Sequence, residues 1–386
     1  MKKIFGSYGV ATRLCALALA IVMLVLPLAA CSNSPVEPTE EEARVVMKIR
    51  DLEVTYDLFR YLFLTYKSEI DGGDNSVWTS PKANEYWRAA IDKIVPILCE
   101  RYASFDLAIA NGVDIYGESI DEAVQKYVDV AIDGNDTNVY ANVARDGNDA
   151  LTYGYYRITV ASADNPYEGY GSRKKYLRAL DELYMTDNVS RLLFRQEVCD
   201  TLMYYMLTDE ETGTIPVDNE SVAKFLHGPN YINTLWISLL FTSEDGSDYE
   251  ATKKKAEELY AVAKELPASE AGNESFRQLI INNTVYTAGD IYMYRGEYLD
   301  RVNDEAFSLG VGETSELIED ATGFYIIRRI PNDSDYITEH FDDLKPVYLS
   351  YAYYAEIEKI KEVLLENVSY TEFFHTLNGT NVVWDK

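Results

Sequence analysis

Hydrophobic residues recur at the three- and four-residue spacing of a helix face through most of residues 55–226. A short strand at residues 45–49 precedes this pattern, and Thr55 is placed to cap the first helix. The first predicted helix begins at residue 55, the second spans about 81–110, and the third begins after Ser119. Residues 172–208 are predicted to be helical in two pieces hinged near 185–187, and residues 217–226 form one more short helix. Residues 133–171, rich in Gly, Asn, Asp and Tyr, are left unassigned.

At Tyr231 the helical spacing gives way to that of buried strands. The run Leu235-Trp236-Ile237-Ser238-Leu239-Leu240-Phe241 is typical of a central strand, and residues 323–330 predict a closing one. Helical segments are predicted between them, around residues 256–263, 276–280 and 304–309. We therefore expect a compact α/β module with a four-stranded antiparallel sheet flanked by helices.

From Phe341 the spacing returns to that of a helix, with hydrophobic residues on one face as far as Leu364. Such a helix can return to the N-terminal helices and complete their domain. The fold class predicted is α+β, a helical domain built from both ends of the chain with an inserted α/β domain. The expected limits are 1–30 for a leader, 31–44 for a tether, 45–230 and 340–386 for the helical domain, and 231–331 for the inserted domain.

The N-terminus carries Lys2, Lys3 and Arg13, followed by an apolar run that ends in Leu28-Ala29-Ala30-Cys31. This is the pattern of a signal peptide, not of the fold. Its last four residues resemble the lipobox of bacterial lipoproteins, which implies cleavage before Cys31 and a lipid on its thiol. An uncleaved membrane anchor is the alternative, and either leaves the rest of the chain outside the cytoplasm. We expect the protein on the extracytoplasmic face of the cell membrane.

The segment after Cys31 is polar and contains prolines, so residues 31–44 are predicted to be a flexible tether. Without residues 1–30 the chain keeps 32 Lys and Arg against 64 Asp and Glu. Nucleic acid and anionic lipid are poor partners for such a balance. Acidity of this kind is chiefly a solubility property.

Two cysteines, Cys99 and Cys199, remain once the leader is removed and Cys31 is lipidated. A disulfide is permitted outside the cytoplasm, but both lie in apolar helical patterns, so buried free thiols are favoured. The three histidines are scattered at His227, His340 and His375. Neither a metal site nor any cofactor is expected.

Five short motifs follow one another in residues 289–327. They are Gly289-Asp290-Ile291, Gly296-Glu297-Tyr298, Glu305-Ala306-Phe307-Ser308-Leu309, Gly312-Glu313-Thr314-Ser315 and Gly323-Phe324-Tyr325-Ile326-Ile327. Because these motifs occur in the order found in parvulins, residues 231–331 resemble this family of peptidyl-prolyl isomerases. The stretch VVMKIRDLEVTYDLFRYL resembles the opening of the PrsA and SurA foldases and chaperones that carry parvulin domains. The resemblance implies unfolded or newly secreted polypeptides as partners; a homodimer is left open.

The resemblance also implies a proline pocket, and there the chain departs from the family. The two pocket histidines of parvulins fall on Ser238 and Tyr325. The methionine and phenylalanine that hold the prolyl ring fall on Tyr298 and Val302. Phe307 and Leu240 are expected to add apolar binding surface. The pocket is thus predicted to be degenerate, and no residue is assigned a catalytic role.

Isomerisation needs no proton transfer, so the missing histidines alone do not exclude activity. Losing both histidines and both ring-holding residues leaves no predefined slot for a prolyl ring. The leading hypothesis is a membrane-anchored foldase or chaperone with a catalytically impaired parvulin-like domain. The alternative is an active isomerase with a rearranged pocket. The 32 tyrosines offer amphipathic surface for unfolded chains, although many of them are expected in the core.

Overall fold

The structure, a computed structural model, describes residues 33–134, 142–145, 151–155, 169–242, 248–284, 288–298, 300–320 and 322–384. The expected leader and Cys31 lie outside these residues. The chain divides into two compact units, which we call the helical unit (Met1–Met206 and Glu356–Lys386) and the α/β unit (Leu207–Ala355). The fold class is α+β.

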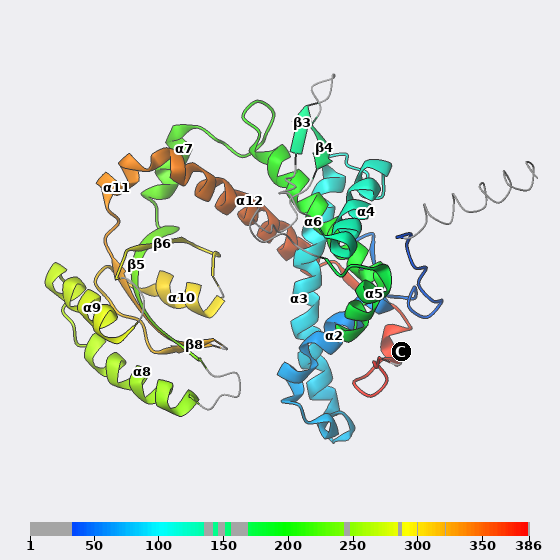
Figure 1. Cartoon of the computed structure of the whole chain (residues 1–386), viewed down its shortest axis with the longest axis horizontal. Coiled ribbons are helices and arrows are strands. Elements are labelled where there is room, and N and C mark those ends of the chain that lie inside the picture. Colours follow the sequence, from blue (N-terminus) through cyan, green and yellow to red (C-terminus); the bar gives the residue numbers. More distant parts are fainter. Residues whose placement is uncertain are drawn as a thin grey trace, which may run out of the picture. The chain divides into compact units, whose positions relative to one another are not determined.

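The helical unit contains helices predicted from hydrophobic spacing and two short 3-10 helices that were not predicted (Figure 1). They are α2 (Tyr56–Asp71), the 3-10 helix η1 (Asn75–Thr79), α3 (Ala83–Ala110), α4 (Glu118–Asp133), α5 (Arg173–Glu182), most of α6 (Asp187–Thr208), the end of α12 (Phe341–Leu365) and the 3-10 helix η2 (Phe374–Thr376). The ends of α3 and the hinge between α5 and α6 agree with the sequence. Gly72, with φ of 61°, ends α2 in the left-handed conformation that glycine favours.

A small sheet in the helical unit joins the two ends of the chain. Its order is β2-β1-β9, formed by Leu52–Thr55, Val45–Ile49 and Val368–Tyr370. The strand at residues 45–49 was predicted, but β2 and β9 are so short that their sequences gave no strand signal. Thr55 stands at the N-cap of α2 as expected, yet its side chain does not cap the helix. A separate hairpin, β3 (Asn142–Arg145) and β4 (Leu151–Tyr155), lies in the stretch left unassigned.

Residues 33–44, which we call the strap, are packed on the helical unit and are not the free tether expected from composition. The Asn33 carbonyl accepts from Arg191 at 2.8 Å, and the Val36 N–H donates to Asp187 at 2.9 Å. Further along, the buried carboxylate of Glu42 pairs with Arg60 on α2 at 3.0 Å. Paired charges and backbone hydrogen bonds fix a polar segment that has little apolar surface to bury.

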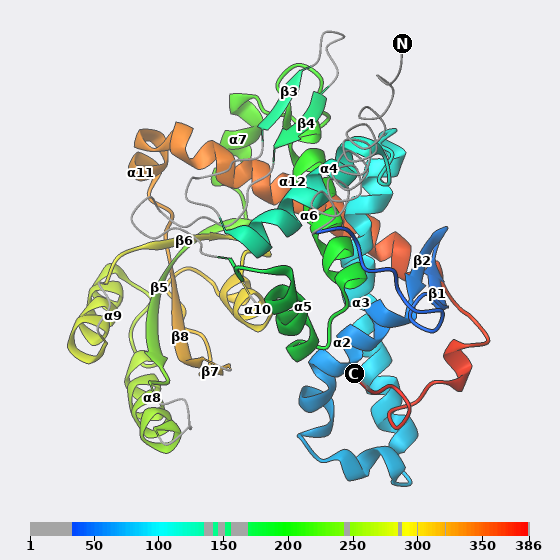
Figure 2. The same ribbon diagram turned by 45° about the vertical axis from the view of Figure 1, so that its right-hand side comes forward.

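The α/β unit is built on the predicted four-stranded antiparallel sheet, which is confirmed. Its order is β6-β5-β8-β7, formed by Ile291–Tyr294, Tyr231–Leu240, Gly323–Ile330 and Ile318–Glu319. Helices α8 (Tyr249–Ala263) and α9 (Glu270–Asn283) cover one face and α10 (Asp300–Ser308) covers the other (Figures 1 and 2). Alternate residues of β5 enter the two cores, as the two-residue period of a strand requires.

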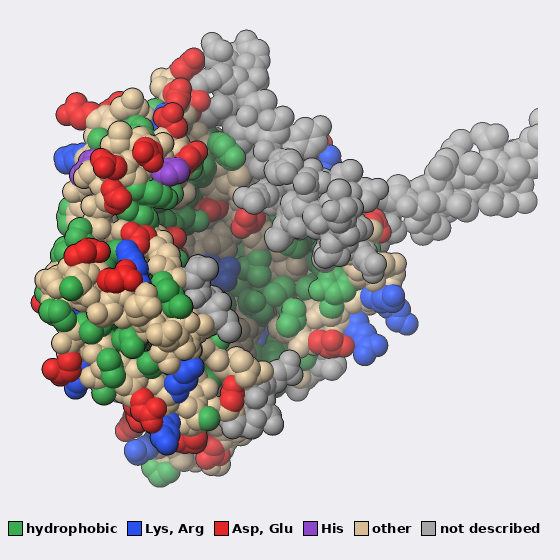
Figure 3. Space-filling model, turned by 60° about the vertical axis from the view of Figure 1, so that its left-hand side comes forward, with side chains coloured by type: hydrophobic (Ala, Val, Ile, Leu, Met, Phe, Trp, Pro, Cys, Tyr) green, Lys and Arg blue, Asp and Glu red, His purple; other side chains and the backbone are tan. Residues whose placement is uncertain are grey.

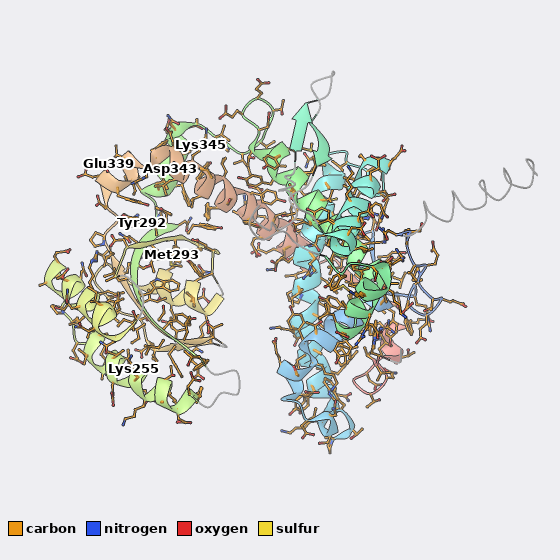
Figure 4. All side chains as sticks on the ribbon, viewed as in Figure 1. Lys255, Tyr292, Met293, Glu339, Asp343 and Lys345 are labelled. Carbon is orange, nitrogen blue, oxygen red and sulfur yellow. The ribbon has the colours of Figure 1, made fainter. Side chains whose placement is uncertain are left out.

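A third cluster of the α/β unit lies beyond residues 231–331. It is formed by α7 (Asn219–Leu226), α11 (Ser334–Glu339) and the start of α12. Tyr292 on β6 lies toward α11 (Figure 4), where its ring stacks on that of Tyr336 with centroids 4.6 Å apart. The domain limits drawn from sequence stay predictions.

Both remaining thiols are free and buried, as favoured from the sequence. Burial raises the pKa of Cys99 to about 11 and that of Cys199 to about 12. On the face shown in Figure 3, acidic side chains are spread among hydrophobic and other residues. Within the described ranges, no helix has the length and apolar character needed to cross a membrane.

Candidate functional site

The positions expected to form a proline pocket lie on the face of the sheet that α10 covers. Ser238 on β5 and Tyr325 on β8 are direct partners across the two strands. The structure therefore brings together the two positions where parvulins carry histidines. Both residues are half-buried. Neither a hydroxyl nor a phenol can reproduce two facing imidazoles.

Trp236 occupies the centre of this region, and the sequence reasoning did not single it out. Its ring centroid is 5.0 Å from that of Tyr298 and 6.2 Å from that of Tyr325. Its indole N–H donates to Thr234, two residues along the same strand, at 2.8 Å. We call these rings, Trp236, Tyr298 and Tyr325, the aromatic face. Trp236 could have been found from the sequence, because it lies two residues before Ser238 and therefore on the same side of the predicted strand.

The remaining predicted positions have different environments. Val302 and Phe307 on α10 are buried in the core against the sheet. The guanidinium of Arg295 also lies 4.5 Å from the centroid of the Phe307 ring. Leu240, at the end of β5, is exposed. A binding role of Phe307 or Leu240 stays a prediction.

The chemistry of the aromatic face is that of rings and hydroxyls. The Tyr325 and Thr322 hydroxyls are hydrogen-bonded at 2.5 Å. Burial, followed by the Glu297 carboxylate, raises the pKa of Tyr298, which keeps this phenol protonated. The three histidines lie elsewhere, after α7, after α11 and in η2. The face can stack on another side chain, and Trp236 packs beside both tyrosine rings at the positions predicted for the proline pocket.

A second candidate site is a groove in the helical unit, with a volume of about 800 Å³. Its walls come from α2, from Trp78 of η1, from the residues that follow α5, and from residues 379–384, which we call the C-terminal tail. The residues lining it are Leu64, Thr65, Lys67, Ser68, Asp71, Gly73, Asn75, Trp78, Glu182, Leu183, Tyr184, Gly379, Thr380, Val382, Val383 and Trp384. No part of this groove was predicted from the sequence.

Two tryptophans fix the C-terminal tail in place. A Cβ atom on Gly379 would lie 1.9 Å from the Trp78 ring, so only glycine allows this close approach. At the other end, the Trp384 indole N–H donates to Asp181 at 2.9 Å. The guanidinium of Arg60 lies 4.5 Å from the centroid of the same ring. Trp78 and Trp384 are each held against other residues, and both line the groove.

Asp71 holds Trp78 in position. Its carboxylate accepts from the Trp78 indole at 2.8 Å, from Lys67 at 2.5 Å and from the Gly73 N–H at 2.8 Å. Burial of the carboxyl opposes ionisation, but the hydrogen bonds from these three donors outweigh it and hold the pKa of Asp71 below its usual value. The groove wall therefore depends on an ionised carboxylate.

Tyr184 is the most unusual residue of the groove. Its φ is 56°, a left-handed conformation just after α5 where glycine is usual. Its N–H donates to the Asp181 carbonyl at 3.1 Å, and the next N–H, of Met185, donates to Leu180 at 2.9 Å, which closes the helix end. A side chain in this conformation costs roughly 1 kcal/mol. Tyr184 is nevertheless 44% exposed and lines the groove.

Comparisons with known proteins give structural matches only. No protein-family model matches the chain, and no curated protein matches it. The solved foldase protein PrsA from Streptococcus pneumoniae str. Canada MDR_19A is 20% identical over 53% of this chain and 75% of its own, with a TM-score of 0.28.

Two further solved structures match over longer stretches. The foldase protein PrsA from Lactococcus lactis is 13% identical over 86% of this chain and 96% of its own, with a TM-score of 0.25. The peptidylprolyl isomerase PrsA from Bacillus anthracis is 14% identical over 70% and 96%, with a TM-score of 0.25. The TM-scores are low, so the function proposed below rests on the residues and contacts of this chain.

Proposed function

We propose that the protein is an extracytoplasmic, lipid-anchored chaperone that binds unfolded or newly secreted polypeptides. The binding site we assign to this function is the groove of the helical unit. The parvulin-like module of the α/β unit is, in this proposal, a poor isomerase. The observation that carries the proposal is Tyr184, an exposed ring kept in a strained backbone conformation at the rim of the groove.

The groove suits an unfolded polypeptide because it offers both rings and polar groups. Leu183, Tyr184 and Val383 are exposed along it, and aromatic rings hold apolar side chains with little loss of conformational freedom. The hydroxyls of Thr65, Ser68 and Thr380 are among its lining groups. Hydroxyls can donate to or accept from the backbone of a bound chain without selecting its sequence.

The aromatic face supports the second half of the proposal. Rotation about a prolyl bond crosses a barrier of about 18–20 kcal/mol, which an enzyme lowers only by holding the twisted amide better than the planar one. That requires a slot shaped for the ring. Here Trp236 packs beside Tyr298 and Tyr325, while Val302 is enclosed in the core. The alternative, an active isomerase with a rearranged pocket, needs these rings to move.

Two assays on the same preparation separate these functions. Proline isomerisation in a tetrapeptide should proceed near the uncatalysed rate, whereas light scattering of an aggregating client should fall as the protein is added. Catalysis near that of an ordinary parvulin would favour the alternative. A client that aggregates equally with and without the protein would remove the chaperone function.

Tyr184→Gly tests the groove by separating binding from folding. Glycine relieves the left-handed strain, so the free energy of unfolding should rise by roughly 1 kcal/mol. Suppression of aggregation should weaken, because an exposed ring is lost from the groove. The matched control is Tyr205→Ala, which removes a tyrosine that is also 44% exposed but lies on α6 outside the groove lining. Equal loss of suppression in both variants would contradict a role for the groove.

The membrane anchor has its own test. Cys31→Ala should block lipidation and yield either retained precursor or soluble protein. A properly processed Cys31→Ala protein that stays in the membrane fraction would show that another element holds it.

A further inference from the structure

We infer that the strap fixes how the helical unit meets its membrane, with the surface of α4 and α6 around Asn33 lying against the lipid headgroups. This inference rests on lipidation of Cys31, as proposed above. It concerns an orientation that a free tether would not impose. The partner is a lipid surface, and the segment that brings it to the protein is the short stretch between Cys31 and Asn33.

The strap begins with a set of hydrogen bonds centred on Asn33. Its side-chain amide donates to Asp129 on α4 at 3.0 Å. Its carbonyl accepts from Arg191 on α6 at 2.8 Å and from Gln125 on α4 at 3.3 Å. Arg191 also donates to Gln125 at 3.0 Å and to Asp187 at 2.9 Å, so Asn33 joins an existing network. One residue is thus held by two helices.

The strap stays attached beyond Asn33. The Val36 N–H donates to the buried carboxylate of Asp187. Glu42, also buried, pairs with Arg60, and the guanidinium of Arg44 lies 3.4 Å from the centroid of the Phe373 ring. Attachment at its start, its middle and its end makes the strap part of the folded unit.

The length of chain between the lipid and the strap decides how close the membrane lies to the helical unit. Only Ser32 separates Cys31 from Asn33, so the two steps of chain between them can span at most about 7 Å. A free tether over residues 31–44 would instead reach an average of about 20 Å. Lipid on Cys31 therefore places the membrane next to the part of α4 and α6 that holds Asn33.

The charges around the strap agree with such a contact. Asp187 is paired with Arg191 at 2.9 Å and lies 3.7 Å from Arg173. Asp129 accepts from both Asn33 and Gln125. Two arginines and two aspartates thus balance one another here, although the chain as a whole is strongly acidic. These four side chains contribute no net charge where Asn33 is held, although the strap itself carries the exposed Glu37, Glu40 and Glu41.

Fluorescence quenching on vesicles tests the orientation. The full lipidated protein carries a fluorescent label at Glu122→Cys or at Ser76→Cys, in vesicles containing lipids with a nitroxide on the headgroup. Glu122 is exposed on α4, nearly one turn before Gln125. Ser76 is exposed in η1, at the far end of α2. Asp57 at the start of α2 accepts from Thr186 and Asn188, which flank Asp187, and Ser76 follows the opposite end of α2, about 20 Å along the helix axis.

The two native cysteines should stay unlabelled, because they are buried and their thiol pKa values are raised. We expect stronger quenching at position 122 than at 76. A flexible Gly and Ser spacer inserted between Ser32 and Asn33 leaves the strap contacts intact and should abolish the difference. Equal quenching at both positions, or quenching that the spacer does not change, would overturn the inference.

Lipidation itself is measured separately, by the mass of the lipidated N-terminal peptide. A protein without lipid would fail the proposed anchoring. A lipidated protein without preferential quenching would fail only the orientation.

Discussion

The aromatic face of the α/β unit and the groove of the helical unit both gather tryptophan and tyrosine, but they use them in opposite ways. In the aromatic face, Trp236 packs beside Tyr298 and Tyr325, at the positions predicted for the proline pocket. In the groove, Trp78 and Trp384 both line an open volume of about 800 Å³.

The hydrogen bond of each indole accounts for the difference. Trp236 donates to Thr234 on its own strand, so its ring lies over the sheet. Trp78 donates to Asp71 on α2, and Trp384 donates to Asp181 on α5. A hydrogen bond to a different element fixes the position of an indole ring independently of the side chains that pack against the ring. The two indoles of the groove are thus anchored to carboxylates of other residues, whereas Trp236 is anchored to a hydroxyl on its own strand.

The largest effect is expected from a residue that supports the α/β unit alone. Arg328 is fully buried and donates to Asn273 at 2.9 Å, to Thr314 at 3.1 Å and to the Pro267 carbonyl at 2.6 Å. Arg328→Ala removes all three hydrogen bonds and leaves the buried Asn273 side-chain oxygen without its donor, which should lower the free energy of unfolding by about 3 kcal/mol. Urea unfolding followed by circular dichroism measures the change.

This variant also sharpens the comparison of the two regions. If client binding belongs to the groove, Arg328→Ala should still suppress aggregation under conditions where the α/β unit is loosened. Arg301→Ala, which removes an exposed arginine of the same unit, is the control and should change stability by less than about 0.5 kcal/mol. Loss of suppression in parallel with the unfolding of the α/β unit would assign binding to that unit instead.

The next effect compares one tryptophan from each region. Trp384→Ala removes a ring that lines the groove together with its bond to Asp181. The amount of protein needed to suppress aggregation should rise about tenfold, the typical consequence of losing an aromatic anchor. Trp236→Ala in the aromatic face should leave suppression unchanged. The reverse order of the two variants would move the client site to the α/β unit.

A pH dependence should follow from Asp71. Its folded-state pKa is lowered, so its contribution to stability is fully present above the unfolded pKa of about 3.9 and is lost as the pH falls through the folded value. As the pH falls through that lowered folded value, Trp78 should lose its ionised partner, which tryptophan fluorescence can follow. Asp71→Asn should be less stable at neutral pH and should lack this part of the acid transition. An identical acid transition in both proteins would show that Asp71 does not hold the groove wall.

The smallest effect is expected from restoring the two histidines. Ser238→His with Tyr325→His returns two imidazoles to facing positions, but Trp236 and Tyr298 still occupy the region and Val302 stays in the core. Groups that shape one site act together, so the tetrapeptide assay should show little gain. Substantial catalysis by this double variant would mean that the rings do not obstruct a prolyl residue.

The sequence by itself determined the features that repeat along a short stretch of chain. Spacing of hydrophobic residues located the helices from α2 to α7, the strands β1, β5 and β8, and the return to helix at Phe341, because periods of 3.6 and 2 are local properties. The resemblance to parvulins placed Ser238 in the first strand and Tyr325 in the last as one pair of positions, and the strand register pairs these two residues. The missing histidines were visible in the sequence without any structure.

Only the tertiary structure decided the strap, the small sheet and the groove. Asn33 and Arg191 are 158 residues apart, and Asp181 and Trp384 are 203 apart. β9 gave no signal because its three residues acquire a strand conformation only by pairing with β1. Hydrogen bonds between distant polar residues leave no periodic trace in a sequence, since any Asn, Asp or Arg can make them. The composition of a polar segment such as residues 33–44 therefore does not tell whether the segment is a free tether or is bound along its length.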